Sequence, residues 1–140
     1  MKYVGIKSCK EKRKAASRGG KLITVKTEDL IAGDCKRHLD YLDGNYRTYI
    51  IFHQNNGKSN DWITARMQKF DALIESIKAN GFDYSKGFIR VGESGVRIDG
   101  SHRASICHYL GIDTLQCLEV KMRLSSGIQK HLEEQRRAYC

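Results

Sequence analysis

The stretch of residues 88–111 most constrains what this chain can fold into. Two short β-branched runs, 88–91 and 96–99, are separated by the sequence GESG, which is the pattern of a β-hairpin. A helix is expected from about His102 to Leu110, ended by Gly111. The chain must therefore pass from a strand into a helix through a tight turn at Gly100.

A longer amphipathic helix is predicted just before this stretch, over residues 63–80. Its apolar side chains recur at alternating spacings of four and three, which forms one apolar stripe: Ile63, Met67, Phe70, Ile74 and Ile77. Asn60 or Asp61 is expected to cap its start, and Gly81 to end it.

The remaining elements are shorter, and the chain contains no proline to mark their ends. Strands are predicted at residues 22–25, 46–52 and 115–120 because these runs are rich in β-branched, aromatic and apolar residues. A turn of helix is predicted from Thr27, a polar segment at 34–45 with a turn at Asp43-Gly44, a loop at 53–61 and a tail helix at 128–138. Together these elements predict a small α/β (α+β) domain, a mixed sheet with a hairpin and flanking helices.

With 140 residues and 16.0 kDa, the chain has room for a single domain, expected at residues 22–120. Residues 1–21 are expected to be a basic, irregular arm, and residues 121–140 a tail or helix. No apolar run approaches the ~20 residues that a membrane span needs, and the start lacks the apolar core of a secretory leader.

The net charge of +9 is concentrated at the two ends of the chain. Residues 1–21 hold eight lysine or arginine residues against one glutamate, and the body is nearly neutral. The arm is either a segment that lies on nucleic-acid phosphates or a solvated terminus.

The cysteine pattern favours a reduced chain, which we expect in the cytoplasm. The number is odd and no CxxC pair exists, so neither a disulfide framework nor a structural zinc site is indicated: Cys9, Cys35, Cys107, Cys117 and Cys140. Cys107 and Cys117 lie in apolar patterns and are interpreted as core residues.

The chemistry is expected at the turn between strand and helix. Free backbone N–H groups and the positive end of a helix dipole attract anions, phosphate above all. Gly100 lets the backbone approach closely, and Ser101, His102 and Arg103 add hydrogen-bond donors. Asp99 could accept a proton or hold a metal ion. In the simpler alternative, Ser101 only caps a helix and the other side chains face solvent.

The order of these motifs resembles the ParB/sulfiredoxin superfamily. The matching features are LIESIKANG at 73–81, the hairpin, DGSHR at 99–103, LGIDT at 110–114 and a final strand. The resemblance covers residues 22–120, and it implies a small α/β domain that binds nucleotide phosphates at the turn after the hairpin.

Three branches of the superfamily differ at this turn. Sulfiredoxins have a nucleophilic cysteine where this chain has Ser101, so sulfinic acid reduction is not expected. Chromosome-partition ParB proteins have GERR and continue into a helix-turn-helix domain. Free-serine kinases have DGHHR, which this chain matches at Asp99, Gly100, His102 and Arg103; Asp34 falls near a position where they have glutamate.

The kinase resemblance implies phosphoryl transfer from ATP or ADP to a hydroxyl of a small molecule or a modified nucleic acid. Asp34 or Asp99 would take the hydroxyl proton, with His102 as a further catalytic residue. Gly100, Ser101, His102 and Arg103 would bind the phosphates, and no metal is expected beyond a nucleotide-bound Mg²⁺. Further contacts to phosphate or substrate are predicted for Lys36, Arg37, His38 and Lys58.

Two alternatives to these assignments stay open. Asp34 could serve only in a turn, and the basic side chains beside it could form a solvated patch. The whole domain could instead be a ParB-like module that binds CTP and DNA without acting on a small substrate, or a nucleotide-binding regulator that has lost catalysis.

Trp62, the only tryptophan, lies at the junction of the predicted loop and the long helix. It could stack on a base, as aromatic platforms do, but burial as an anchor of the helix start is the favoured interpretation.

Overall fold

The computed structural model describes residues 2–5, 20–93 and 95–121, together with four isolated tail positions at 127, 130, 133 and 134. Most of the predicted basic arm and nearly all of the predicted tail helix therefore lie outside the described residues.

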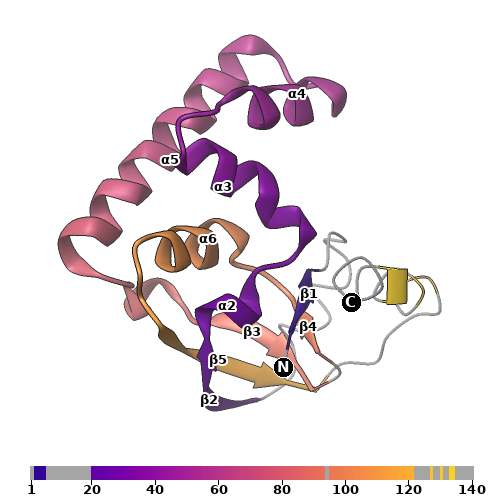
Figure 1. The fold of residues 1–140 in the computed structure, drawn as a ribbon, viewed down its shortest axis with the longest axis vertical. Coiled ribbons are helices and arrows are strands. Elements are labelled where there is room, and N and C mark those ends of the chain that lie inside the picture. The colour runs from indigo at the N-terminus through magenta and orange to yellow at the C-terminus, as the bar shows by residue number, and fades with distance from the viewer. Residues whose placement is uncertain are drawn as a thin grey trace.

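A mixed five-stranded sheet forms one side of the domain (Figure 1). Its strands are β1 (Val4–Gly5), β2 (Gly20–Lys26), β3 (Ile89–Gly92), β4 (Val96–Arg97) and β5 (Thr114–Val120). They are arranged in the order β1-β4-β3-β5-β2. β3 and β4 form the antiparallel hairpin, β3 and β5 are parallel, and β2 lies antiparallel to β5. The predicted mixed α+β fold is confirmed.

The helices gather on one side of this sheet. They are α2 (Thr27–Leu30), α3 (Lys36–Leu42), α4 (Arg47–Asn55), α5 (Asn60–Asn80) and α6 (Ser101–Tyr109), with short 3-10 turns η1 (Gly33–Cys35) and η2 (Tyr84–Lys86). α6 lies over the sheet, and α2, α3 and α5 pack against α6 (Figure 1). α4 packs on α3 and α5 at the end of the domain farthest from the sheet. Within the described residues, no helix combines the length and apolarity needed to cross a membrane.

Two groups of buried side chains make the core. In the first, alternate residues of the sheet meet α6, because successive strand residues point to opposite faces; Ile89, Val91 and Cys117 are fully buried there. In the second, the rings of Tyr41, Tyr49 and Phe70 join α3, α4 and α5, with centroids 4.5–5.8 Å apart.

The two predicted helices and the hairpin are confirmed. The long helix begins at Asn60, and Ser59 rather than Asn60 or Asp61 is its N-cap, since the Ser59 hydroxyl accepts from the Trp62 N–H at 3.2 Å. Gly81 ends it with a φ of +75°. The expectation of buried, free Cys107 and Cys117 is also confirmed.

The predicted strand at residues 46–52 is wrong, because this segment belongs to α4. Its β-branched and aromatic residues favour a strand locally, but Tyr49 is fully buried against Tyr41 and Phe70, which are on neighbouring helices. Burial of one helical face outweighs a propensity that spans only about 1 kcal/mol per residue.

Two further segments differ from the expectations. In residues 34–45 the predicted turn at Asp43-Gly44 is confirmed, but η1 and α3, which were not predicted, occupy most of the segment. The predicted irregular arm is wrong at both of its ends: Val4–Gly5 pair with Val96 and Arg97, and β2 already begins at Gly20.

Candidate functional site

An open pocket of about 530 Å³ lies where α5 passes the start of α6. Residues 99–103 form one wall, and one face of α5 forms another. Arg37 of α3 and His53 of α4 complete the lining. The structure thus brings the predicted turn together with Arg37, one of the predicted α3 contacts, and with α4 and α5, two helices that the resemblance did not assign to the site.

The turn has the geometry that an anion-binding helix start requires. Gly100 precedes α6 with φ +79° and ψ +25°, and no side chain in the described part of the protein caps the helix. A Cβ on Gly100 would lie 2.6 Å from Cγ1 of Ile89, so only glycine fits here. The first N–H groups of α6 have no acceptor within the helix and add to the positive end of its dipole.

The α5 wall consists of Trp62, Arg66 and Lys69, which are exposed and lie on one helical face at spacings of four and three. This face neighbours the apolar stripe, each residue preceding a stripe member by one position. The sequence analysis missed Arg66 and Lys69. Their helical spacing from Trp62 was the signal that could have found them.

The charged side chains of the pocket are predominantly cationic. Arg37, Arg66, Lys69 and Arg103 line it, and Asp99 is the only acidic side chain among its lining residues. Converging cations at a helix N-terminus attract an anion and repel another cation. The predicted contacts of Arg37 and Arg103 with phosphate are thus compatible with their positions.

Arg103 is held in place by the protein itself. Its Nη1 donates to the Gly87 carbonyl at 2.6 Å, and its guanidinium lies 4.8 Å from the centre of the Phe82 ring. Because guanidinium has five donors, this arrangement leaves others for a ligand.

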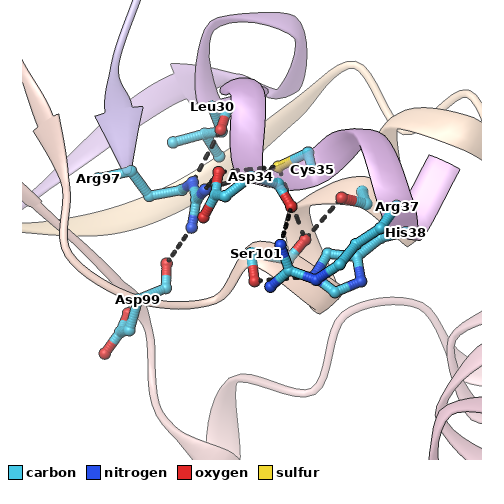
Figure 2. A network of polar contacts seen from close by, with 9 residues as sticks. Leu30, Asp34, Cys35, Arg37, His38, Arg97, Asp99 and Ser101 are labelled. Carbon is cyan, nitrogen blue, oxygen red and sulfur yellow. Dashed lines mark hydrogen bonds and ion pairs between the residues drawn. The ribbon is translucent and has the colours of Figure 1, made fainter. Parts of the chain in front are cut away.

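Two histidines stack at the base of the pocket, His38 and His102, with ring centroids 3.9 Å apart. His38 is fully buried, and its Nε2 lies 3.2 Å from the Ser101 hydroxyl (Figure 2). Burial lowers the pKa of His102 to about 3, helped by Arg66 and Arg37. Burial also lowers the pKa of His38 strongly. Both rings are therefore neutral at pH 7, and His38 supports Ser101 from behind rather than lining the pocket.

Asp34 lies behind the pocket and does not line it. Its carboxylate accepts from Nη2 of Arg97 at 2.5 Å, and the two side chains are 8% and 2% exposed (Figure 2). The backbone carbonyl of Asp34 accepts from Arg37 Nη1 at 3.0 Å, so this turn positions the Arg37 guanidinium. Its predicted role as a proton acceptor stays a prediction.

Asp99 is the acidic residue that does face the pocket. Its two carboxylate oxygens accept from the Arg90 backbone N–H at 2.9 Å and from Arg90 Nε at 2.8 Å. A carboxylate has about four lone-pair positions, so this pairing fixes its orientation and leaves acceptor capacity.

The other predicted contacts fall outside the pocket lining. Lys36 is exposed and pairs with Asp40 at 3.3 Å. Lys58 places its ammonium 4.9 Å from the centre of the Trp62 ring.

The prediction that Trp62 is buried at the start of the long helix is wrong, because the residue is 38% exposed.

No group of three or more histidine, cysteine or acidic residues in the described part of the chain is arranged to hold a metal ion. Mg²⁺ commonly binds through one or two carboxylates and substrate phosphates. Asp99 is compatible with a metal ion of that kind, one that arrives with a nucleotide.

Comparison with known proteins adds no family assignment. The chain matches no protein-family model, no curated protein and no solved structure.

Proposed function

We propose that this domain binds the phosphate groups of a nucleotide in the pocket at the start of α6 and transfers a phosphoryl group from ATP or ADP to a hydroxyl. One observation carries the proposal: four cationic side chains converge with a helix N-terminus on a single pocket, opposed by one acidic side chain that is itself paired with Arg90. The resemblance of DGSHR to the free-serine kinase motif adds support from the sequence.

Phosphoryl transfer assigns distinct roles to the residues of the pocket. The N–H groups of the first α6 turn and Arg103 would bind the phosphate oxygens, with Arg37, Arg66 and Lys69 offsetting the remaining charge. A Mg²⁺ ion bound to the nucleotide would supply further charge neutralisation.

The acceptor hydroxyl would lie beside Asp99. Its oxygen forms a bond to the terminal phosphorus, the bond between that phosphorus and the bridging oxygen breaks, and the hydroxyl proton passes to the Asp99 carboxylate. Asp99 is favoured over Asp34 for this role because it lines the pocket, whereas Asp34 is buried against Arg97.

The alternative is a ParB-like module that binds CTP and DNA without acting on a small substrate. The net charge of +9 favours it, because a basic chain attracts nucleic acid. A steep fall of DNA affinity with salt, together with a preference for CTP, would distinguish the module from the kinase.

Calorimetric titration tests the proposal with ATP, ADP, CTP and tripolyphosphate, each with Mg²⁺. The informative variant is Lys69→Ala, and Lys78→Ala is its matched control, since both are exposed lysines of α5 but only Lys69 lines the pocket. We expect Lys69→Ala to weaken binding roughly 5- to 10-fold, the scale of one charged contact, and Lys78→Ala to leave it unchanged. Failure of every ligand to bind at millimolar concentration would refute the proposal.

A further inference from the structure

The pocket has two chemically different ends. At one end are the donors of the α6 turn and Arg103. At the other end lies the indole of Trp62, in the first turn of α5. A ligand that fills the pocket therefore needs an anionic part and a flat apolar part.

The Trp62 ring is held in place and remains accessible. His53 packs against it edge to face, with centroids 5.0 Å apart and an interplanar angle of 60°. The Lys58 ammonium and the Arg66 guanidinium lie 4.9 and 5.9 Å from its centre. Both cations lie over the ring, on exposed side chains that can move aside, and 38% of the residue is exposed, so an aromatic group can reach the ring.

His53 supplies an independent sign that something is missing from this end of the pocket. Its Nε2 atom is buried and has no hydrogen-bond partner within the described parts of the chain. Leaving a buried polar atom without a partner destabilises a protein, so such atoms are rare in folded proteins. The His53 residue lines the pocket beside Trp62, so a turn of its ring on binding would bring Nε2 to a polar group of the ligand.

We infer that Trp62 is a stacking platform for the nucleobase, and that His53 hydrogen-bonds to the edge of that base. This inference rests on the proposed function, which places phosphates at the α6 turn, and it extends the site to the α4–α5 pair. The proposed function names a nucleotide, and this inference adds where its base binds. A free nucleotide and the 5′-terminal nucleotide of a single strand share this chemistry.

The chain offers a direct measurement, because Trp62 is its only tryptophan. Fluorescence excited at the long-wavelength edge, where tyrosine does not absorb, therefore reports on this ring alone. The two probes are ATP and tripolyphosphate, each with Mg²⁺. Both carry three phosphates, but only ATP has a base, and its absorbance is handled by inner-filter correction. We expect ATP to quench Trp62 and tripolyphosphate to leave its emission nearly unchanged.

Affinities of variants, measured by calorimetry, give the second readout. Because base stacking contributes to binding affinity, we expect Trp62→Ala to weaken ATP binding roughly 10- to 100-fold. The affinity for tripolyphosphate should stay as in the parent chain. Trp62→Phe keeps a ring and should lose less. Tyr109→Ala is the control, because Tyr109 is 48% exposed on α6 and does not line the pocket.

The outcomes separate this inference from the proposed function. Equal affinities for ATP and tripolyphosphate, with Trp62 emission unchanged by ATP, would overturn the platform and leave the phosphate site standing. Binding of neither probe would overturn both. A 5′-phosphorylated oligonucleotide that quenches Trp62 emission and binds with higher affinity than ATP would support the platform. It would also identify a strand end as the source of the base.

Discussion

The guanidinium of Arg97 and the carboxylate of Asp34 form a buried ion pair, 2.5 Å apart, between β4 and η1. Arg97 also donates to the carbonyls of Leu30 at 2.8 Å and Asp99 at 3.2 Å, so one side chain ties the hairpin to the segment leading into α3 and to the turn before α6 (Figure 2). The ion pair thus connects Arg37, which donates to the Asp34 carbonyl, with the 99–103 turn, whose Asp99 carbonyl accepts from Arg97.

Removing Asp34 should therefore destabilise the fold. Asp34→Ala leaves Arg97 buried without its counter-charge, and we expect the free energy of unfolding to fall by about 3–5 kcal/mol. Urea denaturation monitored by circular dichroism measures this loss. Lys36→Ala breaks an exposed pair with Asp40 and should cost at most about 1 kcal/mol. Equal losses in the two variants would show that the buried pair has no special structural role.

Two glycines with nearly the same positive φ allow the cost of steric crowding to be separated from the cost of backbone strain. Gly100 and Gly111 have φ of +79° and +80°, but a Cβ meets Ile89 at 2.6 Å only at Gly100. Gly111→Ala should cost about 1–2 kcal/mol through its left-handed conformation alone. Gly100→Ala adds an overpacking cost of about 1–3 kcal/mol. Thermal unfolding of both variants measures the difference, and a smaller loss at Gly100 would contradict this account.

The stacked histidines predict how stability depends on pH. Burial lowers the pKa of His102 to about 3, and an unfolded histidine has a pKa near 6.5. Between these values the unfolded chain binds a proton that the folded chain excludes, so the free energy of unfolding falls as pH drops below about 6.5. The buried His38, whose pKa is also lowered, contributes in the same direction.

Denaturant unfolding from pH 8 to pH 4 tests this dependence. His102→Gln should flatten the decline relative to the parent chain. His108→Gln is the control, because His108 is exposed on the same helix, and its profile should follow the parent. A parent profile that is flat below pH 6.5 would show that His102 and His38 accept protons without loss of structure.

Asp99→Asn tests the transfer step separately from binding. Asparagine keeps an acceptor oxygen toward Arg90 but cannot take a proton from an acceptor hydroxyl. We expect nucleotide affinity within about 3-fold of the parent and at least a 100-fold loss of phosphoryl transfer, the scale of general base catalysis. The measurement is release of ADP or AMP in a screen of hydroxyl acceptors. Transfer that persists in this variant would remove Asp99 from the base role.

Local patterns in the sequence were sufficient for α5, α6 and the hairpin. The alternating four-three spacing of α5, the GESG turn and the glycine before α6 are local features, and each depends on a few neighbouring residues. The same reasoning failed at residues 46–52, where a strand-like composition forms α4. The deciding contacts of Tyr49, with Tyr41 and Phe70, come from other elements.

The candidate site divides in the same way. The sequence by itself was sufficient to predict the 99–103 turn, since a glycine between a strand and a helix favours that geometry, and it led to the expectation of an anion site there. Only the tertiary structure decided that Asp34 lies buried against Arg97 and that Arg66, Lys69, Trp62 and His53 join the turn in one pocket. These residues come from separate helices, and their meeting depends on long-range packing that no local pattern encodes.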